Sequence, residues 1–108
     1  SATYTNLATA GPTLTVGAGI YLVLWGASSR NDTSGFDALT TVYANGVSSG
    51  SFLTTSAGGG VGFFSVASAG LPTVTGESNT FQMKYQVNGG GTASFYNRWM
   101  VALRTGNA

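Results

Sequence analysis

Few side chains in this sequence can do chemistry. Its 108 residues include no histidine and no cysteine, the residues that supply the usual general base and the commonest transition-metal ligands. A serine nucleophile needs a neighbouring base, and the candidates are Lys84 and three carboxylates. Lys84 lies on the polar side of an alternating segment, where a lysine is ordinarily solvated. We therefore predict that the protein is not an enzyme and has no catalytic residue and no cofactor.

Asp32 and Asp37 are the two acidic residues that lie close together in the sequence. With Asn31 and Ser34 they supply oxygen ligands of the type that Ca²⁺ prefers, but their spacing does not match an EF-hand loop and the glutamate at its twelfth position is missing. Asn and Asp in loops more often hydrogen-bond to the nearby backbone. We favour this second interpretation and predict no metal site.

Charged residues are scarce: four are Lys or Arg, three are Asp or Glu, and the net charge is +1. They make up 6% of the chain, whereas a typical domain has about 25%. Without a basic patch the surface cannot release counterions from a nucleic acid, so no nucleic-acid partner is expected. A nearly neutral surface favours self-association, which suggests an oligomer.

Apolar and polar residues alternate along most of the chain, and no segment of helical length has helical periodicity. Gly- and Ser-rich turns separate the alternating segments. This pattern predicts one all-β domain over residues 1–108, a two-sheet antiparallel sandwich or jelly roll. The strands are predicted over Tyr4–Thr9, Thr13–Val16, Ile20–Ser28, Val61–Ala67, Pro72–Thr75 and Thr80–Val87, and from Thr92 to about Arg104.

The central part of the chain has the strongest local turn signal. Asn45-Gly46 is typical of a two-residue hairpin turn. With these residues as the turn, Ala44 pairs with Val47, and Leu39 is expected to lie opposite Phe52. Both residues are large and apolar, which suits a cross-strand pair on one face of a sheet.

The last two predicted strands, joined by a turn at Asn88–Gly91, define the expected core. In the first of them, one face carries Phe81, Met83, Tyr85 and Val87. In the second, the core face is predicted to carry Phe95, Trp99, Val101 and Leu103. The opposite face of the second strand then carries Tyr96, Arg98, Met100 and Arg104.

The segment Ile20–Trp25 is apolar on both faces and far too short to span a bilayer, so no membrane insertion is predicted. A strand of this kind is covered on both sides. The partner sheet is one cover, and we expect another subunit to be the second. Aromatic residues opposite the core face mark a subunit interface more often than a glycan site. The interface candidates are Tyr21, Trp25, Tyr96 and Met100.

Two parts of the chain resemble a known group of proteins. Residues 4–16 (YTNLATAGPTLTV) lead into residues 19–27 (GIYLVLWGA), and the chain closes with residues 79–87 (NTFQMKYQV), a Gly-rich turn and residues 92–103 (TASFYNRWMVAL). These strand patterns resemble small β domains of tailed-bacteriophage structural proteins: minor capsid or decoration proteins, head fibres and the ends of tail fibres. More distantly, the strand order is similar to that of the C1q/TNF jelly roll.

The resemblance implies a homotrimer on the surface of a virion, on the capsid or the tail. In C1q/TNF-like trimers an inner sheet packs around the threefold axis. The residues that the resemblance places at this axis are Tyr21, Trp25, Tyr96 and Met100, with Phe63 or Phe64. The C1q type often carries Ca²⁺ sites, and this chain has too few acidic residues to match them.

The predicted function is that of a structural protein that decorates or stabilises the capsid or forms a fibre knob. Its partners would be its own copies and the major capsid protein or another virion protein. The alternative is a fibre module that recognises a host-surface glycan or protein through its loops. The loops expected at Ser28–Phe36 and Thr54–Gly60 contain one aromatic residue, Phe36, for stacking on a sugar. The structural role is therefore favoured.

Overall fold

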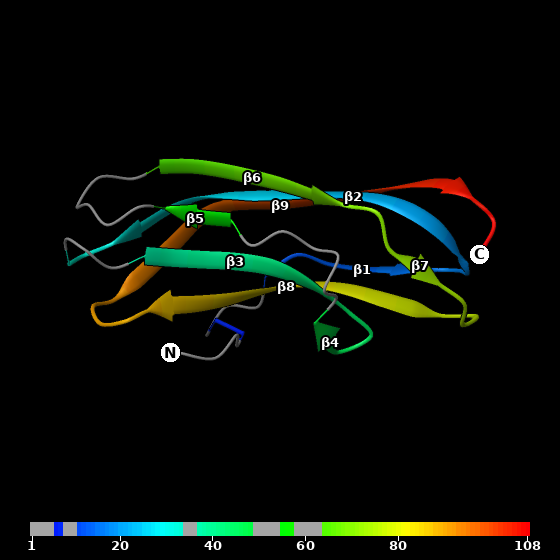
Figure 1. Cartoon of the computed structure of the whole chain (residues 1–108), viewed down its shortest axis with the longest axis horizontal. Helices are drawn as coiled ribbons and strands as arrows, with labels where there is room; N and C mark the ends of the chain where they lie inside the picture. The colour runs from blue at the N-terminus through cyan, green and yellow to red at the C-terminus, as the bar shows by residue number, and fades with distance from the viewer. Residues whose placement is uncertain (1–5, 8–10, 34–36, 49–54, 58–63) are drawn as a thin grey trace.

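The structure is a computed structural model that describes residues 6–7, 11–33, 37–48, 55–57 and 64–108. These residues form strands and no helix, so the all-β prediction is confirmed (Figure 1). The strand predicted over Tyr4–Thr9 lies mostly outside the described residues. The strands are β1 (Thr13–Val16), β2 (Gly19–Asn31), β3 (Asp37–Ala44), β4 (Val47–Ser48), β5 (Thr55–Ala57), β6 (Phe64–Gly70), β7 (Thr73–Val74), β8 (Asn79–Asn88) and β9 (Ala93–Gly106).

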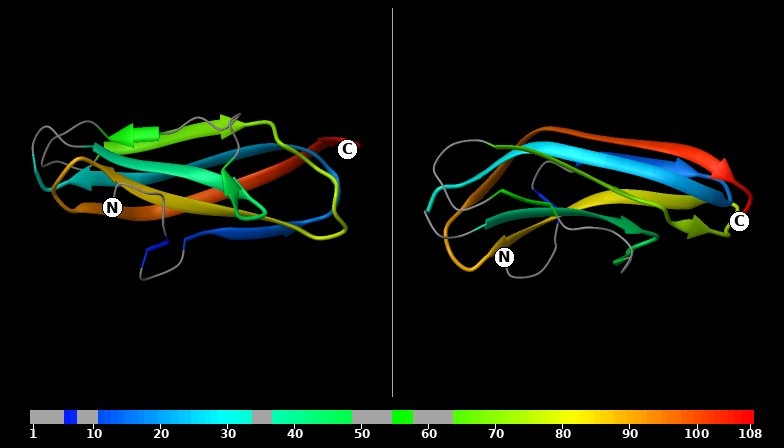
Figure 2. Two further views of the ribbon diagram at one scale, coloured as in Figure 1. Left: turned by 60° about the horizontal axis from the view of Figure 1, so that its bottom comes forward. Right: turned by 45° about the horizontal axis from the view of Figure 1, so that its top comes forward.

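The strands form two antiparallel sheets that lie face to face, as in a sandwich (Figures 1 and 2). Sheet A has the order β1-β8-β3-β4, and β5 also pairs with β3. Sheet B is built on β2, which pairs with β6 and β7 through separate parts of one edge. β9 pairs with β2 along nearly its whole length and so occupies the other edge.

The hydrophobic core lies between the two sheets. β8 contributes one layer of this core, as the alternating pattern predicts, since Phe81, Met83 and Tyr85 are buried. β2 supplies the facing layer, and the rings of Tyr21 and Phe81 meet edge to face with their centroids 5.6 Å apart. Burying such large side chains is the main source of stability in a domain of this size. The core residues of β2 are Tyr21, Val23, Trp25 and Ala27.

The hairpin turn predicted at Asn45-Gly46 is confirmed, but not the register beyond it. Asn45 and Gly46 have φ angles of 52° and 77°, as a type I′ turn requires, and Ala44 pairs with Val47. Leu39 pairs with Ser56 instead of Phe52. The partner strand thus returns to the ladder about four residues later than an uninterrupted hairpin would allow. Phe52 itself lies outside the described residues.

The turn after β8 is also confirmed, although it does not make a hairpin. Gly89 and Gly91 have φ angles of 89° and 79°, a conformation that glycine adopts without steric cost. In the described residues, however, β8 pairs with β1 and β3, and β9 pairs with β2. The chain therefore crosses from sheet A to sheet B at this turn.

A bulge in β9 reverses the face on which its later side chains lie. Ser28 of β2 pairs with Tyr96, and Gly26 pairs with Trp99, so β9 has one residue more than β2 over this stretch. Asn97 has a φ of 52° there, and an extra residue in the left-handed region is typical of a β-bulge. Phe95 is buried, whereas Trp99 is exposed. The prediction that these two side chains share the core face is therefore wrong.

Asn97→Val is expected to lower the free energy of unfolding by about 1–2 kcal/mol, because a β-branched residue tolerates the left-handed conformation poorly. Asn97→Gly is the matched control and should retain or slightly raise stability, since glycine adopts this φ freely. Urea unfolding followed by circular dichroism measures both variants. Equal stability of the valine and glycine variants would contradict a bulge centred on Asn97.

Candidate interaction surface

The outer face of sheet B is apolar and open to solvent. The outer face is the side of sheet B that points away from sheet A. It carries six large apolar side chains of β2 and β9. Tyr96, Trp99, Val101 and Leu103 are 57%, 41%, 51% and 59% exposed. Leu22 and Leu24 are half-buried beside them, since Leu22 pairs with Leu103 and Leu24 with Val101. Directly paired residues have side chains on the same face, so the six form one continuous stripe.

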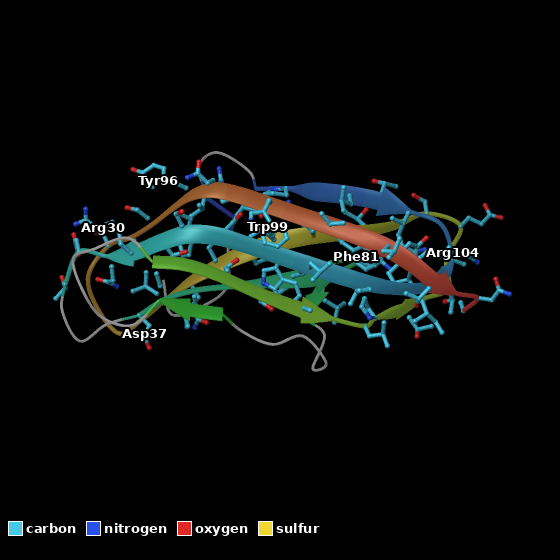
Figure 3. All side chains as sticks on the ribbon, turned by 90° about the horizontal axis from the view of Figure 1, so that it is seen from above. Arg30, Asp37, Phe81, Tyr96, Trp99 and Arg104 are labelled. Atoms are coloured by element: carbon cyan, nitrogen blue, oxygen red, sulfur yellow. The ribbon has the colours of Figure 1, made fainter. Side chains whose placement is uncertain are left out.

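Trp99 lies near the middle of this face, over β2 and β9 (Figure 3). Its cross-strand partner is Gly26, which is buried although it has no side chain. An aromatic ring commonly covers a glycine in the neighbouring strand in this way. We infer that one side of the indole covers Gly26, which leaves the other side available to a partner.

Of the charged residues of sheet B, Arg30 and Arg104 lie towards the ends of this apolar stripe, and Arg98 lies over the Tyr85 ring of sheet A. Arg30 and Arg104 are at opposite ends of the molecule, and Trp99 lies between them (Figure 3). None of the six apolar residues has a charged cross-strand partner among the described pairs. A partner can therefore cover the stripe without removing a charge from water, which avoids the largest cost of forming an interface.

The interface residues predicted from the sequence are divided between the two sides of sheet B. Tyr21 and Trp25 are 6% and 0% exposed inside a single chain, and Met100 packs against the same core. Tyr21 and Trp25 therefore have little or no side-chain surface to offer a partner, whereas Met100 is half-buried. Tyr96 is on the exposed outer face. Phe63 and the side chain of Phe64 lie outside the described part of the chain.

Two of the candidate metal ligands, Asn31 and Asp32, are engaged in hydrogen bonds to the backbone. The buried Asn31 donates from Nδ2 to the carbonyl of Gly90 at 3.1 Å and accepts at Oδ1 from the Thr33 N–H at 2.9 Å. Oδ1 of Asp32 accepts from the Thr92 N–H at 2.8 Å. These bonds hold the loop after β2 against the turn between β8 and β9. This arrangement matches the favoured interpretation of an Asx-rich loop.

Acidification is expected to weaken this loop. The hydrogen bond from the Thr92 N–H, with a further one from the Thr33 hydroxyl, lowers the pKa of Asp32 below its usual 3.8. The stability that this carboxylate contributes is thus present above its unfolded pKa and is lost as the pH falls through the lower folded pKa. In Asp32→Asn this loss should be absent. Urea midpoints between about pH 6 and pH 2 test this, and parallel curves for the two proteins would contradict it.

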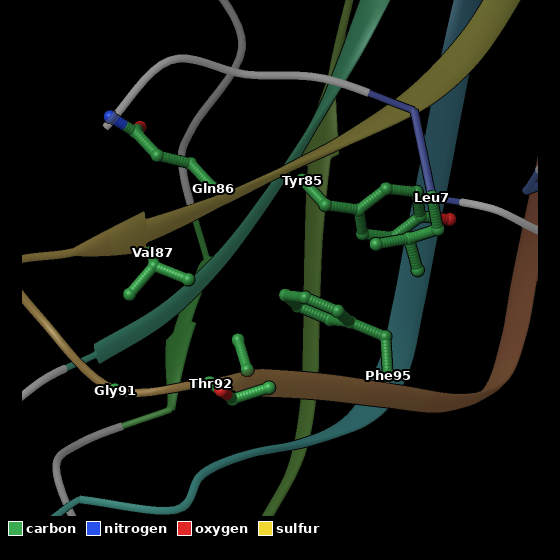
Figure 4. Close-up of a pocket in the computed structure, with 8 residues that line it drawn as sticks. Leu7, Tyr85, Gln86, Val87, Gly91, Thr92 and Phe95 are labelled. Atoms are coloured by element: carbon green, nitrogen blue, oxygen red, sulfur yellow. The ribbon is translucent and has the colours of Figure 1, made fainter. Parts of the chain in front are cut away.

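A small pocket lies between β8 and the start of β9 (Figure 4). Its volume is about 280 Å³, and its lining includes Leu7, Tyr85 and Phe95. The rings of Tyr85 and Phe95 pack with their centroids 4.8 Å apart. Burial raises the pKa of the Tyr85 phenol, against the opposing effect of Arg98, so this hydroxyl is neutral at physiological pH. The lining residues provide no acid–base pair, and the pocket is smaller than most ligand sites.

Comparison with known proteins identifies no relative of this chain. No family model, no curated protein and no solved structure matches the chain. Among the described residues, none belongs to a helix long and apolar enough to cross a membrane.

Proposed function

We propose that this protein is a non-enzymatic structural component of a tailed-bacteriophage virion. In this role it decorates or stabilises the capsid, or forms the knob of a fibre, and it works as a homotrimer. The observation that carries the proposal is the exposed apolar stripe on the outer face of sheet B.

An exposed stripe of this kind favours a partner that is itself a protein. Monomeric proteins rarely expose a large contiguous apolar patch in water, and such patches mark interaction sites. Aromatic and aliphatic residues in the middle with charges at the margin have the anatomy of a subunit interface. The chain extends over 44 × 23 × 20 Å, so a long face is of the same order as the roughly 800 Å² that each partner buries in a standard interface.

The phage assignment and the trimer rest on the resemblance of the two ends of the chain to phage structural domains and, more distantly, to the C1q/TNF jelly roll. The antiparallel two-sheet architecture is compatible with both. In this proposal, each of three copies contributes the outer face of its sheet B to the contact. Tyr96 remains among the interface candidates, and Trp99, Val101 and Leu103 replace Tyr21, Trp25 and Met100.

Glycan binding is the second candidate, because Tyr96 and Trp99 are both exposed on one face and aromatic rings stack on sugars. The neighbours of these rings favour the structural role. Val101 and Leu103 continue the surface, and their aliphatic side chains offer no hydrogen bond to a hydroxyl group. A buried protein interface uses such residues, whereas a sugar site needs polar groups around the aromatic platform.

Two measurements test the proposal. Purified virions of the phage that encodes the chain should contain it, and native mass spectrometry of the isolated protein should give a mass of three chains or a multiple of three. Absence of the chain from purified particles, with presence only in the soluble lysate, would overturn the virion role. A monomeric mass at all accessible concentrations would overturn the assembly. If the protein binds host glycans on an array as a monomer, the second candidate replaces the first.

A further inference from the structure

The edge of sheet B formed by β9 is unusual among the edges of this molecule. β9 is 14 residues long and pairs with β2 along one side. No other described strand pairs with its second side. The other edge strands are shorter: β1 has 4 residues, β4 and β7 have 2 each, β5 has 3, and β6 has 7. Natural sheets keep their edges short because an open strand pairs readily with another chain.

Sequence features that protect an edge lie at the two ends of β9, since a second register shift, at Thr105 beside Arg104, lies at its C-terminal end. The bulge at Asn97 interrupts regular pairing towards the other end, and Arg98 follows it. From Trp99 to Thr105 the strand contains no proline and no glycine, and Arg104 is its one charged residue. The face of this same stretch bears exposed Trp99, Val101 and Leu103. Among the described strands, the stretch of β9 between the two register shifts therefore has an unpaired edge next to an apolar face.

The hydrogen bonds of β2 show which backbone groups lie along the free edge. The Tyr21 N–H donates to the Pro72 carbonyl, on the β7 side, and the Ile20 carbonyl accepts from the Thr105 hydroxyl, on the β9 side. Backbone groups of successive residues alternate between the two sides of a strand. Leu22 and Leu24 therefore bond to their partners Leu103 and Val101. It follows that Met100, Ala102 and Arg104 direct their N–H and C=O groups to the free edge.

We propose that a second copy of this chain pairs with this edge, β9 to β9 and antiparallel about a twofold axis at Ala102. This contact uses the backbone of β9 and goes beyond the function proposed above, which concerns the outer face. Ala102 of each copy bonds to Ala102 of the other, and Met100 bonds to Arg104. The three pairs make about six backbone hydrogen bonds between the two copies.

The side chains select this register over its neighbours. With Ala102 opposite itself, Val101 of each copy lies opposite Leu103 of the other, and two apolar pairs continue the outer face across the junction. Centring the pairing on Val101 would place Arg98 opposite Arg104, and like charges directly opposite are destabilising. Centring it on Leu103 would place Val101 opposite Thr105 and leave a single apolar pair, Leu103 opposite itself. A shift by one residue would turn the apolar face of one copy inward.

A second copy suits this edge better than a charged or unrelated partner. The net charge of the chain is +1, so two copies approach without strong repulsion. A twofold contact uses the same segment on both sides, as the commonest closed oligomers do. The free edge points outward in the plane of the sheet, whereas the outer face points away from that plane. One chain can therefore pair with a second copy through β9 while other copies cover its outer face.

Ala102→Pro tests this pairing. Proline removes the N–H that faces the free edge and leaves the bonds of β9 to β2 intact, and proline is tolerated in edge strands at such positions. Sedimentation velocity should show the mass of the assembly reduced at least twofold, with the circular dichroism spectrum retained. Ala102→Ser, which keeps the N–H, should assemble like the unaltered protein. An unchanged mass for a folded Ala102→Pro protein would overturn the pairing.

Amide hydrogen exchange of the unaltered protein gives the same answer without a substitution. On concentration, the amides of Met100, Ala102 and Arg104 should slow at least tenfold. Those of Val101 and Leu103, which bond to β2, should change much less. If the protein assembles and the first three amides still exchange as in dilute solution, the edge pairing is wrong. The assembly through the outer face would then be the one that remains. Failure of the edge pairing can therefore be distinguished from failure of the proposed function.

Discussion

Replacing Trp25 with alanine is expected to lower the free energy of unfolding by about 3–5 kcal/mol. Trp25 is 0% exposed and belongs to the core cluster between the sheets. Truncation removes the transfer free energy of the indole and leaves a cavity that the flanking strands can only partly fill. A domain of this size has about 5–15 kcal/mol of stability. The variant should therefore unfold at a much lower urea concentration, measured by circular dichroism.

Trp99→Ala is the matched control, because it deletes the same indole from the opposite side of sheet B. Trp99 is 41% exposed, so the variant should lose no more than about 1 kcal/mol of stability as a monomer. The comparison belongs at high dilution, because assembly would add apparent stability to the unaltered protein. Equal losses for the two tryptophans would contradict the assignment of Trp25 to the inner face and Trp99 to the outer face.

The sequence predicts those parts of this fold that depend on local chemistry. The strand Thr13–Val16 is found at its predicted bounds. β8 buries Phe81, Met83 and Tyr85 because strict alternation leaves one apolar face. Asn45-Gly46 makes its turn because asparagine and glycine tolerate the positive φ that the turn requires.

The side of β2 that faces the core is harder to predict, since Ile20–Trp25 is apolar on both faces. One signal was present in the sequence. Arg30 shares its face with Leu22 and Leu24 by the period-two rule, and a charged residue marks the side towards solvent. Continuing the alternation from Arg30 back to Leu22 would have placed Trp25 inside. The aromatic side chains of this segment favour the opposite orientation, but Trp25 and Tyr21 lie on the inner face.

Alternation alone does not predict which side chains of β9 face the core. The extra residue at Asn97 reverses the faces, and asparagine is one of the few residues that adopt a positive φ readily. Asparagine also occurs in ordinary strands and turns, so the bulge becomes evident only from the pairing of Tyr96 and Trp99 with β2. Likewise, the glycines after β8 predict a reversal of the chain, but not a crossing to the other sheet.

Val101→Lys is expected to weaken the assembly at the outer face by about 30-fold or more in dissociation constant. Val101 is 51% exposed at the middle of the apolar stripe. Covering this stripe with a partner would bury an unpaired ammonium group, which costs about 2–5 kcal/mol, and 1.4 kcal/mol is a tenfold change. The variant keeps the backbone of Ala102, so it should sediment as no more than two copies joined through β9.

Val47→Lys is the control, because it makes the same substitution at a similarly exposed position. Val47 is 67% exposed at the start of β4, in sheet A, and lysine there should leave both the fold and the mass of the assembly unchanged. Together, the two variants distinguish the effect of removing any exposed apolar side chain from the effect of disrupting the interface on the outer face of sheet B. If Val101→Lys sediments like the unaltered protein, the partner does not cover this face. If Val47→Lys dissociates equally, sheet A takes part in the contact, and the apolar stripe of sheet B is not the main interface.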